Sequence, residues 1–99
     1  MRAETVETDA AATRLPWRPH SEMYSATISE IARAGGIEVM VYDLPPNPHF
    51  PERIVGWEIH DGPSYDRQVA KASGFDTYAA AKEDATRVAL EQIRRRARR

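Results

Sequence analysis

The chain of 99 residues is long enough for one domain with a modest hydrophobic core. It contains no cysteine, which excludes a disulfide framework, a thiolate nucleophile and a cysteine-ligated zinc. No apolar run approaches the ~18 residues of a membrane-spanning helix, and the polar, acidic start differs from a signal peptide, so we expect a soluble cytoplasmic protein.

The charge is unevenly distributed, although the net charge is only −1. Residues 94–99 contain five of the 14 basic side chains, so residues 1–93 hold 9 basic and 15 acidic side chains, a net charge of −6. One interpretation is a basic tail that improves solubility or folds back onto the acidic body. The other is an arm that binds phosphates or an acidic protein surface.

Residues 1–20 lack apolar periodicity and predict a flexible N-terminal arm. The exception is Leu15–Pro19, where Trp17 stands between two prolines. Trp17 either fastens the arm to the domain or belongs to a short recognition segment. We favour the first alternative because an exposed tryptophan is uncommon without a partner.

Residues 21–36 fit two structures. A helix would use Ser21 as its N-cap, whereas a strand over Tyr24–Ile31 would pair with Ile37–Leu44. The strand is favoured because Thr, Ile and Tyr suit a sheet and Ser interrupts a helix. In that interpretation Ala32–Gly36 is a loop.

The strand over Ile37–Leu44 is apolar on both faces. Three of its residues predict a core face (Ile37, Val39 and Val41), and three others predict an exposed apolar face (Met40, Tyr42 and Leu44). An exposed apolar face on so small a domain favours a homodimer or another protein partner. The proline-rich segment up to Pro51 predicts an extended loop.

The next strands are predicted over Arg53–His60 and Arg67–Ser73, on either side of a turn that starts at Asp61-Gly62. The core face of the first strand consists of Val55, Trp57 and Ile59. The inward residues of the second are either Val69 or the pair Ala70 and Ala72.

A C-terminal helix is the most strongly indicated element. Asp76 or Thr77 supplies its N-cap, alanines follow, and the basic residues gather at its far end. Leu90 lies off the apolar arc, which is formed by Tyr78, Ala81, Ala85, Val88, Ala89 and Ile93. The pattern stops after Ile93, which predicts a frayed last turn or a disordered tail.

Motifs for catalysis are absent from the sequence. The histidines His20, His49 and His60 are far apart and lack metal-ligand spacing with carboxylates. There is no nucleophile elbow, no phosphate loop and no dinucleotide fingerprint. We therefore expect no enzyme, no catalytic residue, no metal and no cofactor.

Two family resemblances rest on the helix and the residues before it. The strands up to Ser73, the turn Gly74-Phe75-Asp76-Thr77 and the alanine-rich helix resemble the arm-binding domains of tyrosine recombinases, which lay a three-stranded sheet on DNA. The helix is also similar in spacing to the last helix of double-stranded-RNA-binding domains, which would require residues 21–34 to be helical. Tyr78 and Ala79 stand where that family keeps two phosphate-binding lysines, and only Lys82 remains.

Together these patterns predict an α+β fold, in which a meander-like antiparallel sheet of three or four strands packs against one C-terminal helix. The domain spans residues 21–93, between the arm at 1–20 and the basic tail at 94–99. The predicted function is a small non-enzymatic binding module that contacts nucleic acid, or an acidic protein surface, through the basic C-terminal tail and a free sheet face. The candidate nucleic-acid contacts are Arg67, Lys71, Arg94, Arg95, Arg96, Arg98 and Arg99. The alternative function is a protein-interaction or homodimerisation module, with Met40, Tyr42 and Leu44 at the interface.

Overall fold

The computed structural model describes residues 14–20, 28–62 and 67–98, and its strands and helix form one α+β unit. The elements in chain order are β1 (Arg18–Pro19), β2 (Ile28–Ala34), β3 (Ile37–Leu44), β4 (Ile54–Asp61), β5 (Gln68–Ser73) and α2 (Tyr78–Ala97). The α+β prediction is confirmed. The sheet has five strands rather than three or four, because the two-residue β1 is added at one edge.

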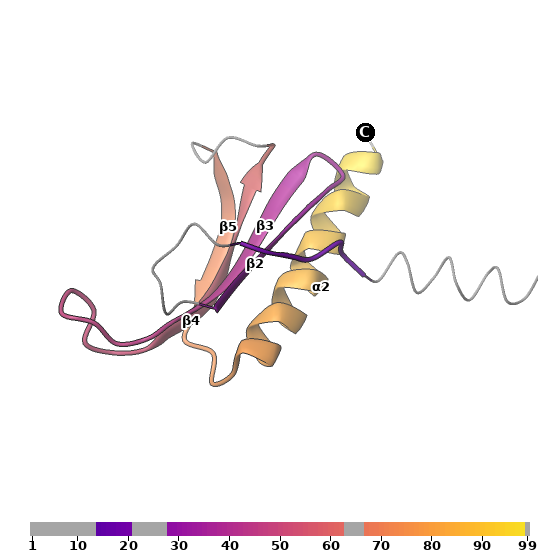
Figure 1. Cartoon of the computed structure of the whole chain (residues 1–99). Helices are drawn as coiled ribbons and strands as arrows, with labels where there is room; N and C mark the ends of the chain where they lie inside the picture. The colour runs from indigo at the N-terminus through magenta and orange to yellow at the C-terminus, as the bar shows by residue number, and fades with distance from the viewer. Residues whose placement is uncertain (1–13, 21–27, 63–66, 99) are drawn as a thin grey trace, which may run out of the picture.

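The sheet is an antiparallel meander in which each strand pairs with its neighbour in sequence, in the order β1-β2-β3-β4-β5. Helix α2 crosses one face and packs against β3 and β4 (Figure 1). Its C-terminal end lies beside the β2–β3 turn, and the long β3–β4 loop projects at the opposite end of the sheet (Figure 1). Among the described residues, β1 and β5 are therefore the edge strands, and the helix covers one face of the sheet.

The β2–β3 hairpin closes through a two-residue turn, Gly35-Gly36. Both glycines have positive φ, 56° and 82°, as the tightest hairpin turns require. The predicted strand over Tyr24–Ile31 is confirmed for Ile28–Ile31, and its first four residues lie outside the described residues. The predicted loop over Ala32–Gly36 is wrong for Ala32–Ala34, which continue the strand. Two left-handed glycines reverse the chain without a longer loop, so pairing continues up to Ala34 opposite Ile37.

The core lies between the sheet and α2. Ala81, Ala85 and Ala89 are completely buried on the helix, as the apolar arc predicted. Their small side chains let the helix approach the sheet closely. They pack on Val39, Val41, Val55, Trp57 and Ile59. Trp57 is 3% exposed, and its indole nitrogen donates a hydrogen bond of 3.0 Å to Asp84 on the helix.

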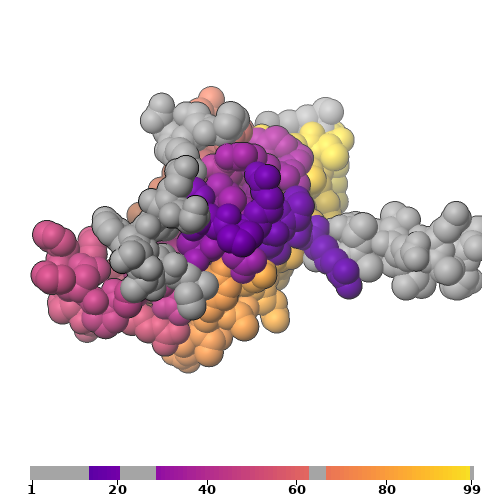
Figure 2. All heavy atoms as spheres, in the orientation of Figure 1, coloured from indigo at the N-terminus to yellow at the C-terminus, as the bar shows by residue number. Residues whose placement is uncertain are grey.

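The segment before β1 fastens the N-terminal arm to the domain, as predicted for Trp17. Leu15 is buried in the core cluster, and Trp17 is half-buried against it. The Lys82 ammonium lies 5.5 Å from the centroid of the Trp17 ring, within cation–π range. Residues 14–20 lie across β2 in the space-filling view (Figure 2). The predicted arm before residue 14 lies outside the described residues.

The sheet face opposite the helix carries buried polar groups. Glu38 is 1% exposed and forms an ion pair with Arg33 across the hairpin. His60, the cross-strand partner of Glu38, lies 3.3 Å from Glu58 and is also buried. The alternating pattern of β4 correctly predicted that Glu58 and His60 point away from the core. It did not indicate that His60 would be inaccessible.

Helix α2 begins and ends through local contacts. The Thr77 hydroxyl accepts a hydrogen bond of 3.0 Å from the Ala80 amide, which decides between the two predicted N-caps. The helix continues through Ala97, so the prediction of a frayed or disordered tail after Ile93 is wrong for the residues described. Arginine is a strong helix former, and positive charge is favourable near a helix C-terminus.

Candidate functional site

Five of the basic residues that the sequence singled out lie at one end of the molecule, together with Arg14, which the sequence did not single out. We name this the arginine end; it comprises Arg14, Arg67, Arg94, Arg95, Arg96 and Arg98. They come from three elements: the segment before β1, the residue before β5, and the last turns of α2. Arg99 lies outside the described residues.

Asp61 joins the last turn of the helix to the sheet. Its carboxylate lies 3.0 Å from the Arg96 guanidinium and 3.8 Å from that of Arg67. The two adjoining turns are also linked, because the Gly62 amide donates to the Gly36 carbonyl at 2.8 Å. The end of α2 is thus held against both turns. Part of the basic segment therefore folds back onto the domain, as one of the two sequence interpretations expected; a binding arm stays a prediction.

The available part is formed by Arg94 and Arg98, which are exposed and one helical turn apart. Within residues 14–20, 28–62 and 67–98 neither guanidinium makes an ion pair. Arg95 is also exposed and lies 3.8 Å from Glu91. At least two cations therefore face solvent from a helical turn with a defined backbone.

A groove of about 290 Å³ lies between the N-terminal segment, the β2–β3 turn and the helix. Its apolar lining is provided by Leu15, Ala34, Leu90 and Ile93, and Arg14 and Arg94 also line it. Leu90, which did not fit the predicted apolar arc, is half-buried here. The groove thus places apolar side chains between two exposed arginines.

The structure does not bring the remaining candidate residues to this end. Lys71 lies in the middle of β5, opposite Glu58, on the face away from the helix. Met40 and Tyr42 are 7% and 9% exposed, and Leu44 is half-buried. The predicted interface residues do share one sheet face, but they offer little surface in the single chain. Their role at an interface stays a prediction.

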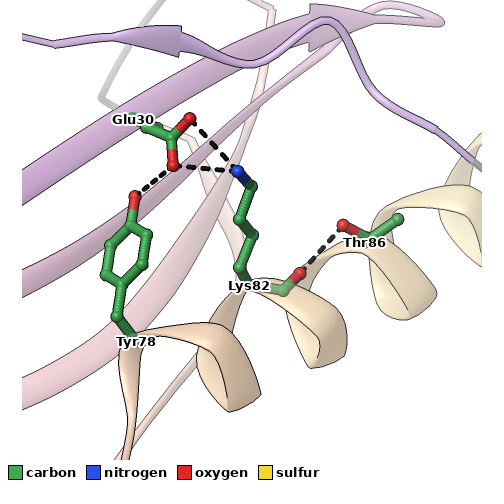
Figure 3. A network of polar contacts seen from close by, with 4 residues as sticks. All are labelled: Glu30, Tyr78, Lys82 and Thr86. Carbon is green, nitrogen blue, oxygen red and sulfur yellow. Dashed lines mark hydrogen bonds and ion pairs between the residues drawn. The ribbon is translucent and has the colours of Figure 1, made fainter.

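A polar network fixes α2 to strand β2 of the sheet. Tyr78 donates a hydrogen bond of 2.7 Å to Glu30 on β2, and the Lys82 ammonium lies 2.9 and 3.2 Å from the two carboxylate oxygens (Figure 3). The Thr86 hydroxyl donates to the Lys82 carbonyl at 2.8 Å. The side chains of Tyr78 and Lys82 both bond to Glu30 on β2, while Thr86 bonds within the helix, which is the arrangement of a structural clamp.

The pKa shifts follow from these contacts. Burial alone would raise the pKa of Glu30, but the bonds from Tyr78 and Lys82 outweigh it and hold that pKa below its ordinary value. Burial raises the pKa of Tyr78, and the bond to Glu30 raises it further. A tyrosine held this firmly in its neutral form is a hydrogen-bond donor to Glu30 and a poor proton-transfer group at neutral pH.

A second, larger hollow of about 380 Å³ lies where the β3–β4 loop meets the end of β5. It is lined by Phe50, which is 49% exposed, and by Glu52 and Arg53. Arg53 makes a bidentate ion pair with Asp43, at 2.9 and 2.8 Å. The hydrogen bond from Arg53 lowers the pKa of Asp43, while partial burial opposes it. Its one arginine is thus already bound, and this hollow offers no unpaired cation.

The described residues contain no cluster of three or more His, Asp or Glu side chains placed to hold a metal ion. No helix among them is both long enough and apolar enough to cross a membrane.

Two residues of the site were missed by sequence reasoning. Arg14 was included in the flexible arm, although the buried Leu15 beside it fixes its place at the groove. Asp61 was interpreted only as a turn residue, yet it holds two arginines. The signal for Arg14 was present, since an apolar Leu-Pro-Trp segment follows it directly. No local signal identifies Asp61, because its partner Arg96 lies 35 residues away.

Comparisons with protein-family models, with curated proteins and with solved structures find no match for this chain. The similarity to double-stranded-RNA-binding domains does not extend to the fold, because Ile28–Ala34 is a strand where that family requires a helix.

Proposed function

We propose that the protein is a small non-enzymatic binding module that contacts nucleic-acid phosphates through the arginine end. The observation that carries the proposal is the helical display of Arg94 and Arg98, both exposed and without an ion pair among the described residues. Guanidinium groups bind phosphate through paired N–H donors, and a folded helix loses less entropy on binding than a disordered tail.

The segregation of charge supports the same function despite the acidic composition. Six arginines surround the C-terminal end of α2, whereas Glu83, Asp84 and Asp76 lie at or near its start. A polyanion can therefore approach the arginine end while these carboxylates stay at a distance. At physiological ionic strength charges farther apart than roughly 8 Å are largely screened, so the local charge matters more than the net charge.

Fluorescence anisotropy with labelled single- and double-stranded oligonucleotides, over a series of salt concentrations, tests the proposal. The double variant Arg94→Ala, Arg98→Ala should weaken binding and lower the slope of log affinity against log salt by about two, since each lost phosphate contact contributes about one. The matched control is Arg53→Ala, Arg87→Ala, which removes the same charge from arginines already paired with Asp43 and Asp84. Equal losses in the two variants, or no binding by the wild type, would refute the proposal.

A second candidate function is homodimerisation or another protein contact through the sheet edge. The supporting observation is β5, whose outer edge has no neighbouring strand among the described residues and whose Val69 is 42% exposed. An edge strand of this kind readily pairs with a strand of another chain. Sedimentation distinguishes the two functions. A dimer that is lost in Val69→Lys and is indifferent to nucleic acid would replace the leading proposal.

A further inference from the structure

We infer that the groove between Arg14 and Arg94 receives an unpaired nucleobase, so that the ligand of the arginine end is a single strand. The inference rests on the proposed function and adds the class of nucleic acid to it. It starts from a juxtaposition: the apolar groove opens between two arginines, one of which is next to Arg98 on the same face of the helix.

The size and lining of the groove fit one small flat group. Its volume of about 290 Å³ lies just below the roughly 300–1,000 Å³ of sites that enclose drug-sized ligands. Leu15, Leu90 and Ile93 provide apolar contacts for the faces of a ring. The guanidinium planes of the two arginines add stacking surfaces, as they do in many RNA sites.

The charges beside the groove select a nucleotide over an uncharged apolar ligand. A base in a strand is flanked by phosphates on both sides, and the groove has an exposed arginine from each of two elements. The hollow near Phe50 lacks this complementarity, since Glu52 lines it and Arg53 is paired with Asp43. Tyr42 on the helix-free sheet face is 9% exposed and cannot serve as a stacking platform. In the part of the chain that the structure describes, the groove is an apolar surface beside Arg94, which makes no ion pair there.

The expected ligand follows from this geometry. Bases inside a duplex are stacked and paired, so a duplex presents only its phosphates to Arg94 and Arg98. A single strand presents phosphates and in addition places a base in the groove. Since the side chains lining the groove are apolar apart from the arginines, we expect little discrimination among bases.

Anisotropy measurements with three probes of equal length test the inference: a mixed-sequence single strand, its duplex, and a single strand of abasic sugar-phosphate units. The wild-type chain should bind the first probe about tenfold more tightly than the abasic strand. The duplex should bind like the abasic strand once the probes are compared at equal phosphate number. Equal affinity for the normal and abasic strands would overturn the inference.

A substitution that fills the groove provides a second test without a change of charge. Ala34→Leu should reduce the affinity ratio of the normal to the abasic strand toward one. Ala97→Leu is the matched control, because Ala97 is exposed at the end of α2 and does not line the groove; it should keep the wild-type ratio. If both variants keep that ratio, the base binds elsewhere and the inference fails.

The outcomes separate this inference from the proposed function. Salt-dependent binding that depends on Arg94 and Arg98 but not on the presence of bases supports the phosphate contact and overturns the groove inference. Absence of binding to all three probes overturns both. If Ala34→Leu fails to fold, the comparison of normal and abasic strands on the wild-type chain still decides.

Discussion

The contact between the β2–β3 turn and the end of α2 should depend on the absence of a side chain at Gly35. A Cβ atom at this position would lie 2.7 and 2.8 Å from the two γ-carbons of Ile93, closer than packed carbons approach. The backbone φ of 56° adds a second cost, since L-residues other than glycine adopt it at about 1–2 kcal/mol. Gly35→Ala should therefore destabilise the fold in two ways, through backbone strain and through the steric clash with Ile93.

The neighbouring glycine is a matched control. Gly36 also has a positive φ, 82°, but the nearest atom to an added Cβ is an Arg96 nitrogen at an ordinary 3.8 Å. Gly36→Ala should lower the free energy of unfolding by about 1–2 kcal/mol, the cost of the backbone conformation. Gly35→Ala should lower it by about 2–5 kcal/mol, because the clash adds an overpacking cost of about 1–3 kcal/mol. At about 4–8 °C per kcal/mol for a domain of this size, the melting temperatures should differ by at least about 4 °C.

Thermal and urea unfolding followed by circular dichroism measure these differences. Ile93→Ala removes both γ-carbons, so it should cost less stability in the Gly35→Ala background than in the wild type, with a coupling of about 0.5–3 kcal/mol. Equal destabilisation by the two glycine substitutions, together with additive behaviour of Ile93→Ala, would refute the argued clash.

Three further predictions concern the polar contacts. Glu30→Gln should destabilise the fold by about 1 kcal/mol at pH 7, since the ion pair is partly solvated. Because the folded pKa of Glu30 lies below its ordinary value of 4.5, this difference should be complete above 4.5 and vanish as the pH falls through the folded pKa. Asp61→Asn should raise affinity for oligonucleotides about threefold at low salt, because it removes a carboxylate from the arginine end and releases Arg96. Trp57→Phe should lower the free energy of unfolding, measured with urea, by about 1 kcal/mol, because phenylalanine cannot donate the hydrogen bond to Asp84.

Each of these predictions has an outcome that contradicts it. A Glu30→Gln difference that grows below pH 4.5 would mean that the carboxylate is not stabilised by its charge. Unchanged or weaker oligonucleotide binding by Asp61→Asn would show that Asp61 positions the arginines productively. A Trp57→Phe chain as stable as the wild type would mean that the indole bond contributes nothing beyond the hydrogen bonds to water that it replaces.

Much of the sheet and helix could be predicted because local patterns and tertiary packing agree there. Val55, Trp57 and Ile59 alternate, and the alanines of α2 recur at helical spacing, so both core faces were identified from sequence. The Gly35-Gly36 turn was also present in the sequence. It was missed because Ala32 and Ala34 have weak strand propensity and resemble loop residues.

The rest could not be predicted, because it depends on contacts between distant segments. The apolar pattern ends at Ile93, yet the helix continues, and Arg96 in its last turn forms an ion pair with Asp61 across the fold. Glu38 is a polar residue on the face expected to be exposed, and no local pattern indicates its burial. The groove exists only where Leu15 and Leu90 meet, 75 residues apart in sequence.

The arginines of the last turns of α2, opposed by Asp76 before the helix and by Glu83 and Asp84 in its first half, give the described part of the chain an electric dipole along the helix, although the net charge of the chain is only −1. In the field of a polyanion a dipole experiences a torque before it experiences much net attraction. The chain should therefore turn its arginine end toward the polyanion during approach, so that a larger share of encounters begins in a productive orientation. Because added salt shortens the range of this field, it should slow association as well as weaken the complex.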